Sequence, residues 1–169
     1  MNYLFKILIL ALLFQSCQEE KQISSTNPTN WNKRIVNHPL ADTLTTGISY
    51  LSVYPQIYSQ TEHRTHSLTV TVSMRNTNRK DTLFIEKAEF FNTHGKLIRT
   101  YFKEHIFIAP METVEIVIDE VDKDGGTGAN FLFDWKIKPN ANEPLFEGVM
   151  ISTSGQQGLS FTTQGKRIE

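Results

Sequence analysis

Apolar side chains recur at every second position through most of the chain, and this spacing constrains the fold more than any other feature. The clearest stretch carries four large apolar residues on one side, Phe131, Phe133, Trp135 and Ile137. Between them lie Leu132, Asp134 and Lys136. Successive side chains of a β-strand point to opposite faces, so this pattern predicts a strand with one buried face.

The same alternation recurs in further stretches that are separated by turn signals. Apolar and polar residues alternate cleanly from 68 to 75, and the alternation from 113 to 119 is interrupted only by Val117. Less regular runs cover 46–54, 83–91, 96–103, 145–152 and 159–161. No part of the chain after the N-terminus shows sustained helical spacing. We therefore expect eight or nine short strands in an all-β fold, an immunoglobulin-like antiparallel β-sandwich over residues 46–169.

Three local signals refine this prediction. The apolar parity changes inside the run 83–91, which indicates a β-bulge near Glu86 and Lys87. Asn92-Thr93-His94-Gly95 is typical of a hairpin turn, because glycine adopts the left-handed conformation at little cost. The polar stretch 60–67 lacks apolar residues, and we expect it to be a loop.

Length and charge bound the function classes. The chain has 169 residues and a formal net charge of −1, so one domain is expected. No cluster of Lys and Arg supplies the phosphate contacts that a nucleic-acid-binding face needs, and nucleic acid is not an expected partner. The single cysteine, Cys17, excludes an intrachain disulfide and a cysteine-based zinc site.

The N-terminus has the features of an export signal. Lys6 precedes an apolar run from Ile7 to Phe14, and Ser16 and Cys17 follow it. A basic start, a short apolar run and a small residue are typical of a secretory signal peptide, here residues 1–16. The segment 13–17 resembles a bacterial lipobox, which implies that Cys17 is lipidated and becomes the first residue of the mature protein. The alternative is a free cysteine in an apolar helix.

Residues 17–45 are expected to form the lipidated cysteine and a flexible linker. The acidic residues just after Cys17 suit either a surface-export tag or a plain polar tether. Residues 22–32 are rich in Ser, Thr and Asn and bury too little apolar area to offset their ordering entropy. Trp31, Ile35 and Val36 are exceptions that suit docking on the domain.

The glycine-rich turn before the Phe131 strand is the leading candidate site. Its Asp-x-Asp-Gly start at 122–125 resembles the start of a calcium loop, but the twelfth-position carboxylate and the flanking helices of that motif are missing. The missing parts favour a solvated acidic turn over a calcium site, and a structural cap is a further alternative. The candidate binding residues here are Asp122, Asp124, Gly125, Gly126, Gly128, Asn130, Gln156 and Gln157.

Other candidates carry weaker signals. Tyr54 and Tyr58, near a strand end, form either an aromatic platform for a peptide or glycan, or a cover over the core. His63 and His66 lie in a polar stretch without a third histidine motif, which favours exposed polar residues over a zinc site. No Gly-x-Ser-x-Gly elbow occurs. The residues indicate no cofactor, no metal and no catalytic group.

Several motifs together resemble a known family. They are V-Y-P-Q-I-Y at 53–58, S-M-R-N-T at 73–77, G-G-T-G-A-N-F at 125–131 with Trp135, and Q-Q-G-L-S-F at 156–161. The chain thereby resembles a family of bacterial exported proteins known as domain of unknown function number thirty-one twenty-four. The resemblance implies a periplasmic or lipid-anchored protein and implies no activity. A shorter stretch, 68–96, is similar to immunoglobulin-like domains of plant stress proteins.

The sequence thus predicts a lipid-anchored β-sandwich in the bacterial cell envelope, attached to the outer membrane on its periplasmic or outer side. It would act as a binding or structural module, with another envelope protein or a glycan as partner. The rival hypothesis is a calcium-type binder or hydrolytic enzyme that uses the Asp122–Asn130 turn.

Overall fold

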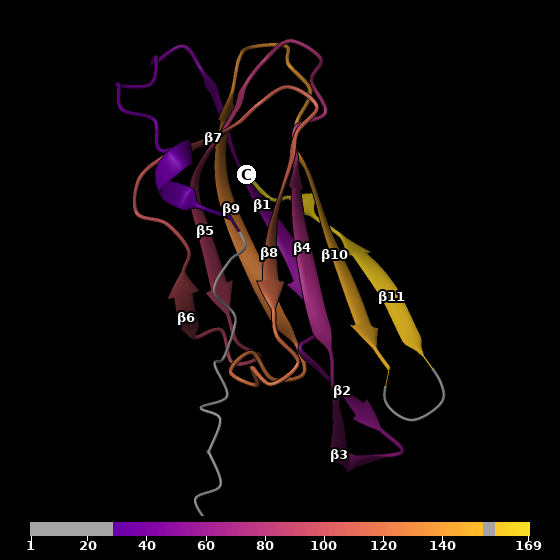
Figure 1. Ribbon diagram of the computed structural model, residues 1–169. Helices are drawn as coiled ribbons and strands as arrows, with labels where there is room; N and C mark the ends of the chain where they lie inside the picture. The colour runs from indigo at the N-terminus through magenta and orange to yellow at the C-terminus, as the bar shows by residue number, and fades with distance from the viewer. Residues whose placement is uncertain (1–28, 154–157) are drawn as a thin grey trace, which may run out of the picture.

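The computed structural model describes residues 29–153 and 158–169 (Figure 1). The predicted signal peptide, Cys17, Gln156 and Gln157 lie outside the described residues. In the described part, the regular structure is a short 3-10 helix, η1 (Trp31–Arg34), and strands arranged in antiparallel sheets. The all-β antiparallel prediction is confirmed. No helix in these two ranges is long and apolar enough to cross a membrane.

Two sheets enclose a common core. The large sheet runs in the order β12 (Lys166–Arg167), β1 (Thr45–Val53), β9 (Ala129–Ile137), β5 (Leu83–Phe91) and β6 (Leu97–Thr100), and β7 (Ile106–Ile108) also pairs with β5. The small sheet runs in the order β11 (Leu159–Gln164), β10 (Leu145–Ser152), β4 (Thr69–Arg75) and β8 (Thr113–Ile118). A hairpin of β2 (Gln56–Ser59) and β3 (Thr61–Ser67) projects beyond them (Figure 1).

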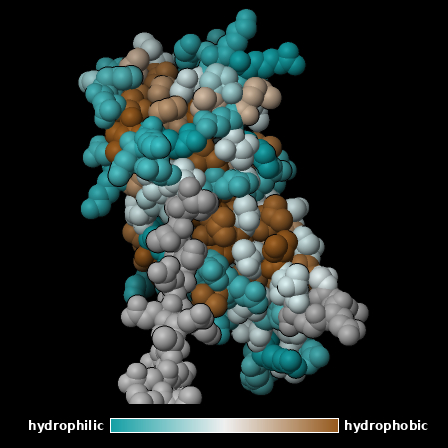
Figure 2. Space-filling view, viewed as in Figure 1, coloured by the Kyte–Doolittle hydropathy of each residue, from teal (hydrophilic) through white to brown (hydrophobic). Residues whose placement is uncertain are grey.

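The core lies between the facing surfaces of the two sheets. Strand β9 occupies the middle of the large sheet, between β1 and β5, and its four predicted apolar residues are all buried. The Phe133 ring stacks on Phe146 of the small sheet with a centroid distance of 4.2 Å. The outer face of the small sheet is mixed, because Val117, Thr71 and Val149 form one row across it. Apolar side chains reach the surface on the face shown in Figure 2.

The indole of Trp135 depends on strand β1 beside it. Gly47 is the residue opposite Trp135 in the β1–β9 ladder. An added Cβ at Gly47 would lie 2.3 Å from Cζ2 of Trp135, so only glycine leaves room for the ring there. Trp135 Nε1 donates a hydrogen bond to Ser49 Oγ at 3.0 Å, which satisfies the one polar atom of a fully buried indole.

Two of the local predictions are confirmed and one is wrong. The β5–β9 register shifts between Ile85 and Lys87, which is the predicted bulge. Gly95 has φ +72° in the β5–β6 turn, as the hairpin signal indicated. The stretch 61–67 is a strand and not a loop. It is held by its backbone ladder to β2 and carries mostly exposed polar side chains, so it lacks the alternation that marks a buried face.

Buried asparagines tie together the loops at one end of the sheets. Asn76 Nδ2 donates to the carbonyls of Asp81 and Ile108, and Asn76 Oδ1 accepts from the backbone N–H of Asn78. Asn78 in turn exchanges hydrogen bonds with the backbone of Asn142. Three separate loops are therefore fixed by two side chains, and buried amides of this kind are stable only when satisfied.

We expect Gly47→Ala to destabilise the protein by about 1–3 kcal/mol, the cost of forcing an extra carbon into a packed core. The new methyl must displace the indole and weaken its hydrogen bond to Ser49. The free energy of unfolding from urea titration measures this effect. Gly158→Ala is the matched control, because its Cβ would meet only the Ser152 carbonyl at 4.0 Å. Equal stability of the two variants would contradict this account of Trp135.

Candidate functional site

The residues before the first strand dock on the domain. We call residues 29–44 the N-terminal segment. The Trp31 ring packs on Phe102 with a centroid distance of 5.0 Å. Ile35 forms an isolated bridge with Ile106 of β7, and Val36 N–H donates to the His105 carbonyl at 2.9 Å. The contacts of the domain therefore extend upstream of residue 45, into the stretch that composition assigned to the flexible linker.

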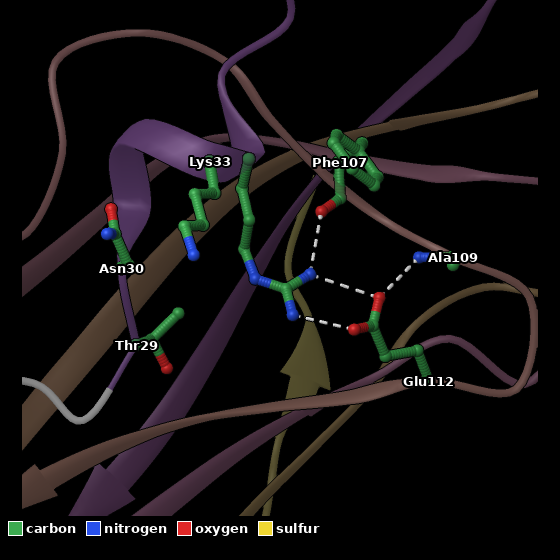
Figure 3. A pocket seen from close by; sticks show the side chains of 7 residues that line it. Thr29, Asn30, Lys33, Phe107, Ala109 and Glu112 are labelled. Carbon is green, nitrogen blue, oxygen red and sulfur yellow. Dashed lines mark hydrogen bonds and ion pairs between the residues drawn. The ribbon is translucent and has the colours of Figure 1, made fainter.

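An ion pair closes the first cavity along this segment, which has a volume of about 420 Å³ (Figure 3). Arg34 donates to both carboxylate oxygens of Glu112, at 3.0 Å and 2.6 Å, and to the Phe107 carbonyl at 3.4 Å. Glu112 also accepts from Ala109 N–H at 2.8 Å. The hydrogen bond from Arg34 holds the pKa of Glu112 below its ordinary value, against the opposing effect of burial. The charge of the guanidinium is already paired with Glu112, so we interpret this ion pair as a clasp that holds the N-terminal segment on the domain.

A second cavity, of about 320 Å³, lies farther along the segment. We call it the lysine-rimmed cavity. Its apolar and small lining residues are Pro39, Leu40, Ala41, Leu44, Thr82 and Phe84. Its polar rim consists of His38, Lys80 and Lys138. An apolar interior with a few polar groups at the rim is typical of small-molecule sites, and this volume is at the lower end of their range.

The two lysines at this rim differ in whether they have an anionic partner. Lys138 Nζ lies 2.7 Å from Asp81 Oδ1, outside the cavity lining. Lys80 is exposed and forms no ion pair with the described part of the chain. His38 Nδ1 faces the Pro39 carbonyl at 3.1 Å. Among the described residues, no carboxylate lines the cavity, so one lysine charge there is uncompensated.

A third cavity, of about 220 Å³, is acidic and is lined in part by Glu86, Asp134 and Glu169. Lys136 Nζ lies 2.8 Å from Glu86, and Lys87 Nζ lies 3.8 Å from Asp134. Burial raises the pKa of Asp134, which Lys87 opposes and the neighbouring carboxylates reinforce. Within 29–153 and 158–169, no group of three or more His, Cys, Asp or Glu residues is placed to hold a metal ion.

The glycine-rich turn is anchored by its first aspartate. The Asp122 side chain is 2% exposed, and Arg99 Nη2 donates to its Oδ2 at 3.0 Å. Its Oδ1 accepts from Asp124 N–H at 3.1 Å. Burial opposes the charge on Arg99, but hydrogen bonds to Tyr101 and Asp122 outweigh it and raise the pKa of Arg99. Asp122 is therefore not a solvated ligand but the buried half of an ion pair that closes this end of the core.

The rest of the turn is held by Thr93 of the adjacent hairpin. Thr93 N–H and Oγ1 both donate to the Gly125 carbonyl, and Gly128 N–H donates to Thr93 Oγ1 at 2.9 Å. Gly126 has φ +70°, which only glycine adopts readily. Asn130 lies in the ladder of β9 between its partners on β1 and β5. This geometry is that of a cap with satisfied backbone.

The two tyrosine candidates flank Gln56, whose backbone N–H donates to the Gly126 carbonyl of the turn at 3.3 Å. The Tyr54 ring packs against Phe161 at 5.8 Å and covers part of the core. Tyr58 is 61% exposed on the projecting hairpin. His66 Nε2 lies 2.8 Å from Ser152 Oγ, and His63 lies 3.4 Å from Glu62 on the exposed face of β3.

Sequence reasoning missed the lysine-rimmed cavity. Its walls come from the N-terminal segment, the start of β5 and the end of β9. The available signal was a small apolar group, Leu40, Ala41 and Leu44, inside an otherwise polar stretch.

We expect Asp122→Asn to destabilise the domain by about 1–3 kcal/mol, since it leaves Arg99 without its anionic partner. Asp124 is exposed, and Asp124→Asn should leave stability within about 0.5 kcal/mol of the parent. Urea titrations of both variants, with and without millimolar calcium, make the comparison. If calcium raises the free energy of unfolding of the parent protein and of neither variant, the turn would instead be a cation site.

Acidification should release the N-terminal segment before the core unfolds. The pKa of Glu112 is lowered in the folded state from its ordinary 4.5. Its contribution is therefore complete above pH 4.5 and is lost as pH falls through the lowered value. Trp31 emission should shift to the red over that range, and Glu112→Gln should produce the shift at neutral pH. Trp31→Phe supplies the background from Trp135, and a spectrum unchanged by Glu112→Gln would contradict the clasp.

Comparison with known proteins gives one family and one structural likeness. A comparison with curated proteins finds no match. A solved structure titled "Crystal Structure of Thermotoga maritima 1070" is similar over 71% of this chain and 94% of its own, with 11% sequence identity and a TM-score of 0.43. Residues 46–168 match the model of the family described as "Protein of unknown function (DUF3124)". That match spans most of the chain, which therefore belongs to the DUF3124 family, as its motifs indicated.

Proposed function

We propose that the protein is a lipid-anchored binding module of the bacterial cell envelope, with the lysine-rimmed cavity as its binding site. The observation that carries the proposal is the position of this cavity. One of its walls is the N-terminal segment, the same stretch that leads back toward Cys17. The site and the attachment to the membrane thus belong to one continuous piece of chain.

The pairing of the strands supports an immunoglobulin-like sandwich for this module. An immunoglobulin domain has strands B and E paired in one sheet and C and F in the other. Here β4 pairs with β8, and β5 pairs with β9, in the corresponding chain order. The flanking positions are exchanged, since β1 lies beside β9 and β10 lies beside β4. The proposed class is therefore an immunoglobulin-like core with its first and last strands interchanged.

The tether is short in this proposal. Eleven residues lie between Cys17 and Thr29, so the chain takes twelve residue steps from one to the other (29 − 17 = 12). Even a fully extended chain of that length spans at most about 40 Å. Thr29 Oγ1 donates to the Glu115 carbonyl at 3.1 Å, so the chain enters the domain beside the edge strand β8. The module would be held within about one domain diameter of the lipid surface.

The rival function, a calcium-type or hydrolytic site on the Asp122–Asn130 turn, has less support. Asp122 is engaged by Arg99, and Thr93 takes up the backbone groups of the turn. Gln156 and Gln157 lie outside the described residues. The observed contacts favour a structural cap.

We expect Cys17→Ala to abolish incorporation of labelled palmitate and to change the migration of the protein on gels. The reason is that the thiol of Cys17 is the only one in the chain available for acylation. Labelling in the source bacterium followed by membrane fractionation measures the outcome. Ser16→Ala is the control, because alanine is also small enough for the position before the cleavage site. Palmitate label retained in Cys17→Ala would sink the anchoring proposal.

A further inference from the structure

We infer that the lysine-rimmed cavity takes a small amphipathic anion, a carboxylate on an apolar chain of about eight carbons. This inference rests on the proposed function and names the ligand class for its site. Three properties of the cavity point to this ligand class: its apolar walls, the uncompensated charge at its rim and its volume.

The apolar walls of the cavity favour a ligand with an apolar chain. Leu40 and Leu44 approach from the N-terminal segment, and Phe84 from the outer face of β5. All three side chains are partly exposed, so the domain leaves a concave apolar surface open to water here. Covering such a surface with an alkyl chain is favourable by the ordinary hydrophobic effect. A purely polar ligand would gain little from these walls.

The rim selects the sign of the charge. Lys138 is neutralised by Asp81 at 2.7 Å, whereas the Lys80 ammonium forms no ion pair with the described residues. A carboxylate at the mouth of the cavity would pair with Lys80 while its chain lies on the apolar wall. An amine in the same position would meet the unpaired Lys80 ammonium and no lining carboxylate within the described ranges, which is repulsive.

The volume limits the size of the ligand. A cavity of about 320 Å³ corresponds to about ten water-sized groups at roughly 30 Å³ each. A saturated carboxylate with about ten non-hydrogen atoms fits this number. A diacyl lipid is several times larger and would leave most of its chains outside.

The test uses octanoate as the probe and the full lipidated protein in nanodiscs. Equilibrium dialysis of labelled octanoate is compared with empty nanodiscs, so that partition into lipid is subtracted. We expect saturable binding of one octanoate per protein. Octan-1-ol, octylamine and acetate serve as probes of the chain alone, the opposite charge and the headgroup alone. Each should bind at least tenfold more weakly.

Two variants locate the site, and a third serves as a matched control. Lys80→Gln should weaken octanoate binding about three- to fivefold, the scale of an exposed ion pair. Lys96→Gln removes an exposed lysine from the distant β5–β6 turn and should change nothing. Ala41→Trp places a large ring in the cavity and should abolish binding of every probe. Thermal melting verifies that each variant is folded.

The outcomes separate the ligand class from the proposed function. Equal affinity for octan-1-ol, or unchanged affinity in Lys80→Gln, would overturn the anionic ligand while the cavity still stands as a binding site. Failure of all four probes to exceed empty nanodiscs, or equal binding by Ala41→Trp, would overturn the cavity as the site of the module.

Discussion

The contact of one indole with one glycine is the constraint on which the rest of the structure depends. Trp135 fills the middle of the core only because Gly47 opposite it has no side chain, and Ser49 accepts its N–H. The same alternation places Phe131 and Phe133 on the same buried face. Since a one-residue slip of β1 against β9 would bring Thr46 or Ile48 to the indole, this contact fixes the register of the two strands at the centre of the large sheet.

Polar side chains fix the loops at the ends of the sheets, beyond the apolar core. Arg99 and Asp122 close one end, with Arg99 also 6.0 Å from the Phe90 ring. Asn76 and Asn78 hold the loops of the other end. These interactions are buried or partly buried and mutually satisfied, so each depends on its partner being in place. They hold the loops by side-chain hydrogen bonds, and the lysine-rimmed cavity lies beside the loops that Asn76 and Asn78 hold.

The sequence could predict features that depend on neighbouring residues, but not contacts between segments far apart in the chain. The buried face of β9, the bulge at Glu86 and the hairpin at Gly95 follow from neighbours in the chain, and each was predicted. Strand β3 was missed because its side chains are polar and its pairing is purely backbone. The lysine-rimmed cavity was missed because Leu40 and Phe84 come from segments far apart in the chain, and no periodicity records their proximity.

In the proposed function, the N-terminal segment connects the membrane anchor to the binding cavity. Both therefore depend on the same equilibrium, the docking of this segment on the domain. Arg34 and Trp31 hold it on the domain, and Leu40 and Leu44 form a wall of the cavity a few residues later. A ligand that binds only when this wall is in place stabilises the docked segment by mass action. In the proposed function, the reciprocity of linked equilibria means that a pull on the segment from a membrane anchor would weaken ligand binding by the same free energy. The proposed function therefore implies that occupancy of the cavity is coupled to the state of the tether, whichever small molecule fills it.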